Sequence, residues 1–166
     1  MIIRDESPAD RPHIDLLLDE AFGGTYESRL VARLRQAGLV AVALVGEEDG
    51  QIIGHIVMSR LPAQLDGRAV RALALAPMAV QPDRQRRGVG ARLLAAALER
   101  ARAREAQAIF VLGHPAYYSR FGFSSGLAAK ITAPFTGPSF MALELVPGTL
   151  SGVAGAVAYP AAFERE

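Results

Sequence analysis

Gln85-Arg86-Arg87-Gly88-Val89-Gly90 is the most informative stretch of this sequence. It follows the apolar run Ala69–Val80 and opens a helical pattern that continues to about Ala106. The first N–H groups of a helix lack backbone partners and carry partial positive charge, so they attract anions. Glycine has no Cβ, which lets a phosphate approach the backbone closely. The stretch therefore predicts a strand, a glycine-rich turn and a helix that together bind a phosphate group.

Arginines surround this turn. Positions 83–87 hold Arg84, Arg86 and Arg87 against Asp83, a local net charge of +2, whereas the whole chain carries only +1. Guanidinium groups suit phosphate oxygens because they donate hydrogen bonds in a planar fork. Such a cluster is ordinarily a solvated helix entrance. Its position directly before Gly-x-Gly favours a phosphate site instead.

The turn resembles the acetyl-CoA signature of the GCN5-related N-acetyltransferase (GNAT) family, Q/R-x-x-G-x-G/A, at every fixed position from Gln85 to Gly90. The preceding residues Leu75–Pro82 look like that family's cofactor-side strand, and Tyr117–Phe123 resembles its Y-x-x-x-G-F motif. The order of elements is similar to the YhbS-like bacterial branch of the family. The resemblance covers residues 1–125 well and the remainder more loosely.

This resemblance implies an α/β (α+β) fold with a mixed, mostly antiparallel sheet. We expect six or seven strands flanked by about four helices, with a central splay between the fourth and fifth strands, all in a single domain over residues 1–166. The patterns along the chain agree with this fold. Strands are expected over 1–4, 39–45, 51–61, 68–80, 108–112 and 140–146, with another beginning at 121–123. Helices are expected from Pro8 to about Ala21, with Ser7 as cap, then over 25–38, 89–106 and 115–120.

The resemblance also implies the cofactor contacts. Backbone N–H groups at Met78, Ala79 and Val80 would serve the thioester carbonyl and the pantetheine amides of acetyl-CoA. The phosphates would lie against the turn and the start of the following helix, at Gln85, Arg86, Arg87, Gly88, Val89, Gly90 and Ala91.

Tyr118 is the candidate general acid, because it occupies the tyrosine position of Y-x-x-x-G-F. A phenol with a pKa of about 10 can give a proton to a leaving thiolate. The alternative is that Tyr117 and Tyr118 are packing aromatics, and Tyr117 is the fallback acid. Gly113-His114-Pro115 departs from the commoner family pattern, in which an asparagine and a longer helix often precede the tyrosine.

A general base is harder to find. Many family members carry a glutamate on the strand before the turn, but Ala69–Val80 offers only Arg71, which stays protonated at neutral pH. Glu27 is the possible base, with His55 and His114 as further candidates, and each also has an ordinary structural explanation. A water relay, or an amine that is already neutral when it binds, would also serve.

Composition excludes several classes. The chain has no cysteine, so disulfides and a cysteinyl-acyl intermediate are impossible. A net charge of +1 argues against a general nucleic-acid coat. Leu93 stands where a dinucleotide fingerprint needs its third glycine, and no Gly-Lys-Ser/Thr triplet exists for a P-loop. No apolar run is long enough for a membrane helix, and the acidic start is unlike a secretory signal, so we expect a cytoplasmic protein without a metal site.

The sequence thus predicts an acetyl-CoA-dependent N-acetyltransferase that transfers an acetyl group directly to a primary amine. The acceptor would be a small molecule or a peptide, and the protein a monomer or homodimer that binds neither nucleic acid nor membrane. The alternative is a non-catalytic acyl-CoA sensor or regulatory module. A third interpretation, an arginine-rich domain for nucleic acid or other anions, would show steep salt dependence and indifference to coenzyme A.

Overall fold

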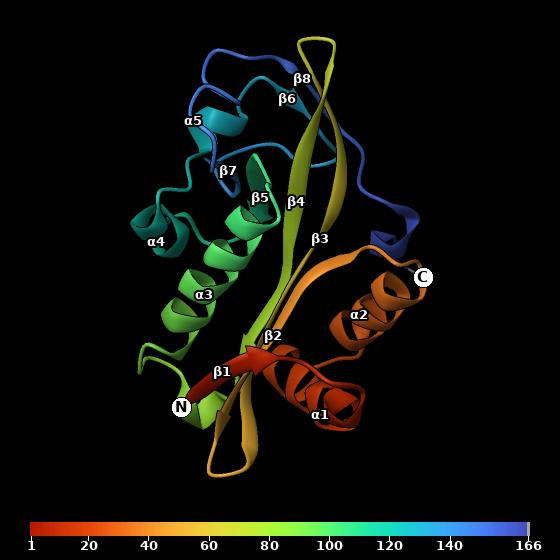
Figure 1. Cartoon of the computed structure of the whole chain (residues 1–166), viewed down its shortest axis with the longest axis vertical. Helices are drawn as coiled ribbons and strands as arrows, with labels where there is room; N and C mark the ends of the chain where they lie inside the picture. The colour runs from red at the N-terminus through yellow and green to blue at the C-terminus, as the bar shows by residue number, and fades with distance from the viewer. Residues whose placement is uncertain (166) are drawn as a thin grey trace. The chain divides into compact units, whose positions relative to one another are not determined.

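The computed structural model describes residues 1–165, which contain eight strands of one mixed sheet and five α-helices (Figure 1). The strands are β1 (Ile2–Asp5), β2 (Val40–Glu48), β3 (Gln51–Leu65), β4 (Arg68–Val80), β5 (Ala108–Leu112), β6 (Ile131–Thr132), β7 (Phe140–Glu144) and β8 (Gly155–Val157). The helices are α1 (Arg11–Phe22), α2 (Tyr26–Gln36), α3 (Val89–Ala103), α4 (Pro115–Tyr118) and α5 (Ser125–Ala128). The main strand order is β1-β2-β3-β4-β5-β7, and β8 pairs with β3 and β6.

The chain divides into two compact units. The first unit comprises Met1–Ser59, Ala76–Ala101 and Arg165, and the second comprises Arg60–Leu75 and Arg102–Glu164. The long strands β3 and β4 and the helix α3 each have residues in both units.

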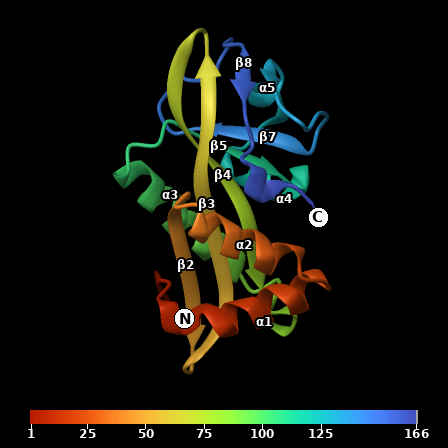
Figure 2. The ribbon, with the colours of Figure 1, turned by 90° about the vertical axis from the view of Figure 1, so that its right-hand side faces the viewer.

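The first unit is an antiparallel meander with helices on both faces. β2 pairs with β1 and with β3, and Val45 lies opposite His55 in the β2–β3 register. Side chains of successive strand residues point to opposite faces. The helix α3 covers one face of these strands, and α1 and α2 cover the other (Figure 2).

The apolar periodicity of the helices explains their burial. In α1, Ile14, Leu17 and Leu18 are buried, as the sequence pattern predicts. The predicted cap at Ser7 and first helical residue Pro8 are confirmed, but Pro8–Asp10 is a 3-10 turn and the α-helix α1 begins at Arg11. Asp10 still closes the turn, because its carboxylate accepts the backbone N–H of Ser7 at 2.7 Å.

The second unit contains a parallel strand pair, as the short, fully apolar run of residues 108–112 predicts. β5 runs parallel to β4 and antiparallel to β7, and Ala108, Ile109 and Phe110 are fully buried. The β4–β5 ladder ends where Leu75 faces Val111, and no later residue of β4 has a register partner on β5 within residues 1–165. This end of the ladder agrees with the predicted splay between the fourth and fifth strands.

The last third of the chain differs most from expectation. The strand predicted to begin at Phe121-Gly122-Phe123 does not form there; Ser124 makes only an isolated bridge with Ala142 before α5 begins. The sequence pattern also misses β6 and β8, so residues 1–165 contain eight strands rather than six or seven and five α-helices rather than about four. These strands have only two and three residues, which is too short for an alternating pattern to be visible.

Candidate active site

Hydrogen bonds fix the start of the turn between β4 and α3. Gln81 donates its backbone N–H to the carbonyl of Ile53 at 2.8 Å, and Arg84 donates to the carbonyl of Gln81 at 2.8 Å. The side-chain amide of Gln85 donates back to the carbonyl of Val80 at 3.1 Å. The glutamine of the motif therefore holds the end of β4 in this structure.

The N–H groups that follow are free. Among residues 1–165, the backbone N–H groups of Arg86 to Ala91 have no acceptor. The backbone reaches this arrangement through left-handed conformations at Arg86, with φ of 64°, and Gly88, with φ of 80°. The first helical bond runs from the N–H of Arg92 to the carbonyl of Gly88 at 3.1 Å. Successive N–H groups of this kind, at the positive end of a 15-residue helix, are suited to a phosphate group.

The arginines around the turn have different partners. Arg84 pairs with Glu48 on β2, so its charge is already compensated. Arg86 and Arg87 are exposed. Arg84, Arg87 and Arg92 also line a cavity of about 130 Å³ together with Met1, Glu48, Ile53 and Val89. Two of the three arginines predicted for phosphate binding are thus left with uncompensated charge in the described contacts.

The last residues of β4 belong to the same unit as the turn. Ala79 is buried, whereas Met78 and Val80 are half-buried. The strand β3 lies beside these residues. Its Ile53 accepts the hydrogen bond from Gln81, and a Cβ atom added to its Gly54 would lie 3.5 Å from the carbonyl oxygen of Ala79. The three predicted β4 positions and the turn therefore follow one another along one edge of the first unit.

Tyr118 lies in the second unit, at the end of α4. Its half-buried ring makes edge contacts with Tyr117 and Phe123, with ring centroids 5.0 and 5.6 Å away. Burial, with a smaller contribution from neighbouring Tyr117, raises the pKa of Tyr118 to about 12. The phenol therefore stays protonated across the whole neutral range.

The neighbours of Tyr118 have structural roles. His114 caps α4, and its carbonyl accepts the N–H groups of Tyr117 and Tyr118 at 3.1 Å. The Tyr117 ring lies 5.4 Å from that of Phe121 and is covered by the guanidinium of Arg120 at 5.5 Å. Both arrangements match the ordinary structural explanations of these residues.

The candidate bases in the first unit differ sharply in environment. Glu27 lies in the first turn of α2, is partly exposed, and takes part in no described hydrogen bond within residues 1–165. His55 is fully buried, and its Nε2 lies 2.8 Å from Oε1 of Glu6. Nothing in the sequence pattern singles out Glu6, because a glutamate before a helix cap is ordinarily a surface charge.

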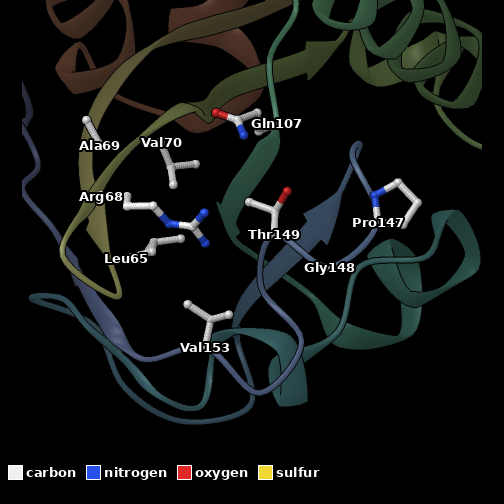
Figure 3. A pocket seen from close by; sticks show the side chains of 9 residues that line it. All are labelled: Leu65, Arg68, Ala69, Val70, Gln107, Pro147, Gly148, Thr149 and Val153. Atoms are coloured by element: carbon white, nitrogen blue, oxygen red, sulfur yellow. The ribbon is translucent and has the colours of Figure 1, made fainter.

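Two larger cavities have other linings. In the first unit a cavity of about 490 Å³ is lined by residues that include Asp10, His13, Leu16 and Glu20. In the second unit Arg68, Gln107 and Thr149 contribute to a cavity of about 240 Å³ (Figure 3). Neither is lined by a residue that the sequence predicts to bind cofactor or to act in catalysis.

Residues 1–165 contain no group of three or more histidine and acidic side chains placed to hold a metal ion. Over the same residues, no helix combines the length and apolar character needed to cross a membrane.

A family model described as an acetyltransferase (GNAT) domain matches residues 3–126, which include the turn and Tyr118. The chain belongs to the GNAT family. The match to this GNAT model ends at residue 126, within α5 and before β6, β7 and β8.

Individual GNAT relatives cover the rest. The chain is 36% identical over 170 residues to an uncharacterized N-acetyltransferase, YhbS of Escherichia coli K12, and the alignment covers 99% of both proteins. The crystal structure of E. coli YhbS in complex with CoA matches with a TM-score of 0.89 and 34% identity, over 99% of this chain and 92% of that one. A GNAT acetyltransferase from Brucella melitensis in complex with acetyl-CoA matches with a TM-score of 0.80 and 33% identity, over 98% and 97%. The predicted fold is confirmed by these matches.

Proposed function

We propose that the chain is an acetyl-CoA-dependent N-acetyltransferase that transfers the acetyl group directly to a primary amine, with residues 1–166 as one catalytic domain. The observation that carries this proposal is the run of unpaired N–H groups from Arg86 to Ala91 at the start of α3. It coincides with the family's acetyl-CoA signature. The CoA and acetyl-CoA complexes of two relatives of similar sequence support the same donor for this chain.

The turn fits a pyrophosphate group. Its unpaired N–H groups can each donate a hydrogen bond to a phosphate oxygen, and the helix dipole adds favourable potential. Arg86 and Arg87 provide charge that no described acidic side chain compensates, whereas Arg84 is paired with Glu48. In this proposal Gln85 acts indirectly, because its amide holds the end of β4.

The end of β4 would hold the reactive part of the donor. When bound, acetyl-CoA supplies an acyl carbonyl that is activated by its thiol leaving group. We assign the backbone of Met78, Ala79 and Val80 to the carbonyl and pantetheine amides. Backbone donors aimed at a carbonyl oxygen stabilise the negative charge that develops there during acyl transfer.

Tyr118 would donate to the thiolate sulfur. The pKa of about 12 keeps Tyr118 protonated, and the phenol is therefore a hydrogen-bond donor rather than a strong acid. Complete transfer of its proton to a thiolate would be unfavourable in free energy, because the corresponding thiol has a pKa of only about 8.5. Tyr118 therefore stabilises the departing thiolate by hydrogen bonding, and solvent completes the protonation.

The first experiment is calorimetric titration of coenzyme-free protein with acetyl-CoA, with pantetheine as control. The expected result is micromolar binding, about −8 kcal/mol, that is lost with pantetheine because it lacks the phosphates. A screen of primary amines for amine-dependent CoA release then tests the reaction. Absence of acetyl-CoA binding would refute the proposal.

A non-catalytic acyl-CoA sensor is the second candidate. It is favoured by one observation: no carboxylate occurs in β4, and the described contacts leave Glu27 uninvolved. Tight binding of acetyl-CoA without CoA release for any amine in a broad panel would select the sensor. Release that depends on one amine would exclude it.

A further inference from the structure

His55, Glu6 and Arg35 form a buried hydrogen-bonded row in the first unit. Oε1 of Glu6 lies 2.8 Å from Nε2 of His55, and Oε2 of Glu6 accepts Nε–H of Arg35 at 2.9 Å. The side chains of His55, Glu6 and Arg35 are 0%, 11% and 14% exposed. Charged groups at this depth are costly unless they are paired, so the row is a specific arrangement rather than a surface contact.

The partners determine where the protons are. Burial alone would raise the pKa of Glu6, but hydrogen bonds from His55 and Arg35 outweigh it and hold the pKa below its usual value. Glu6 is therefore ionised and accepts from both neighbours. In neutral His55 the proton then lies on Nε2, and Nδ1 carries the lone pair.

Nδ1 of His55 is left without a hydrogen-bond partner in residues 1–165. The atom is buried, and Nη2 of Arg35 is likewise buried and without a partner in these residues. A buried polar atom without a partner is destabilising, so native structures rarely leave one without a water or ligand. A basic nitrogen, oriented by a carboxylate and left without a partner, has the arrangement that enzymes use for a histidine base.

The position of His55 connects it to the proposed site. Gly54 faces α3, because a Cβ there would lie 2.6 Å from Cδ1 of Leu93, so His55 faces the other side of the strand, towards α2. Ile53 is bonded to Gln81, and position 54 lies against Ala79. His55 is thus one strand, about 4.8 Å, from the β4 backbone assigned above to the thioester.

We propose that His55 is the proton acceptor of the acetyl transfer, acting through a water molecule bound at Nδ1, with Glu6 and Arg35 as positioning residues. This inference rests on the proposed function. As the C–N bond forms, the amine nitrogen gives one proton through the water to Nδ1, and Glu6 stabilises the imidazolium. The C–S bond breaks, the sulfur gains a proton from solvent, and His55 returns its proton to solvent.

Glu6 and Arg35 are the charged groups that face His55 in the described contacts, from the segment after β1 and from α2. The register partner on β2 is Val45, and the adjacent β4 residue is Ala79, so neither strand adds a charge there. Activity should therefore depend on an imidazole whose Nδ1 can take a proton, and kcat/KM should fall as the pH is lowered.

His55→Gln is the direct test, because its amide can still donate to Glu6 but cannot take a proton. We expect a loss of about 10²-fold or more in kcat, loss of the acid limb, and unchanged acetyl-CoA binding. His13→Gln, at an exposed histidine of α1, is the matched control and should keep the wild-type profile. Glu6→Gln should keep the acid limb but lower kcat. An unchanged profile in His55→Gln, or loss of the acid limb in Glu27→Gln instead, would overturn the proposal.

A measurement without turnover separates this inference from the proposed function. Nitrogen-15 NMR of the wild-type protein should show one of the three histidines as the Nε2–H tautomer, identified by its loss in His55→Gln. A predominant Nδ1–H tautomer would overturn the inference even if acetyl-CoA binds. Failure of acetyl-CoA to bind to the wild type would instead refute the proposed function, and this inference with it.

Discussion

A Cβ atom at Gly113 would lie 2.5 Å from Cε2 of Tyr118, closer than any side chain can approach a ring without displacing it. The ring of Tyr118 therefore rests directly against the backbone of residue 113. Gly113 is itself fixed, because its N–H donates to the carbonyl of Ser139 at 3.0 Å. The Gly-His-Pro sequence that departs from the commoner family pattern thus creates the space that Tyr118 occupies.

Gly113→Ala should displace Tyr118. We expect a loss of about 1–3 kcal/mol in the free energy of unfolding from overpacking, and a fall in kcat approaching that of Tyr118→Phe. Unfolding in urea and amine-dependent CoA release measure the two effects. Gly24→Ala is the control, since a Cβ there meets nothing within 4 Å. Wild-type kcat in Gly113→Ala would show that the ring position is not important.

Tyr118→Phe removes the proposed donor to the thiolate and keeps the ring. We expect kcat to fall by about 10²-fold or more, with little change in acetyl-CoA affinity. Because burial raises the pKa of Tyr118 to about 12, the wild-type enzyme should show no alkaline limb from this group below pH 10. A kcat profile from pH 6 to pH 10 checks this, and an alkaline limb that disappears in Tyr118→Phe would contradict it.

Arg87→Ala should weaken acetyl-CoA binding more than Arg84→Ala does, because Glu48 already compensates the charge of Arg84. We expect a roughly tenfold higher Kd for Arg87→Ala, and a smaller dependence of Kd on salt than in the wild type. Calorimetry at two salt concentrations measures both. Arg102→Ala, an exposed arginine late in α3, is the control. Equal effects at Arg84 and Arg87 would mean that the Glu48 pair opens when the cofactor binds.

Gly88→Ala tests the backbone of the turn. Gly88 has open space around its Cα but a φ of 80°, so the cost of a side chain comes from conformation rather than from a clash. Alanine in this region costs about 1–2 kcal/mol, and a shifted turn would misdirect the unpaired N–H groups. We expect weaker acetyl-CoA binding with a small loss of stability. Affinity equal to the wild type would argue that the phosphates bind elsewhere.

Features that depend on residues close together in the sequence were predictable from the sequence. The bounds of β4, the start of α3 at Val89 and the parallel β5 follow from apolar runs and glycines close in the chain. The row of His55, Glu6 and Arg35 was not predictable, because its bonds join residues 49 and 29 positions apart. The ion pair between Arg84 and Glu48 was missed for the same reason, because a count of charges within residues 83–87 does not include an acidic partner on another strand.

The carboxylate of Asp10 should make the stability of the first unit depend on pH. Its two carboxylate oxygens accept from Arg4 at 2.7 and 2.9 Å, and one also accepts the backbone N–H of Ser7. The hydrogen bonds from Arg4, with help from Ser7, hold the pKa of Asp10 far below its usual range. A carboxylate with a lowered folded-state pKa stabilises the protein above its unfolded pKa of about 3.9, and that stabilisation is lost as the pH falls towards the folded value.

Asp10→Asn should therefore lower the free energy of unfolding at pH 7 by about 1–3 kcal/mol, because Arg4 loses its ionic partner while the side chain keeps its size. The difference from the wild type should shrink as the pH falls below about 4, since the wild-type carboxylate then loses its advantage over the unfolded state. Urea unfolding at pH 7 and at lower pH measures this difference, with Asp49→Asn in the exposed β2–β3 turn as the control. A difference that stays constant with pH would show that Asp10 acts through hydrogen bonding alone and not through its charge.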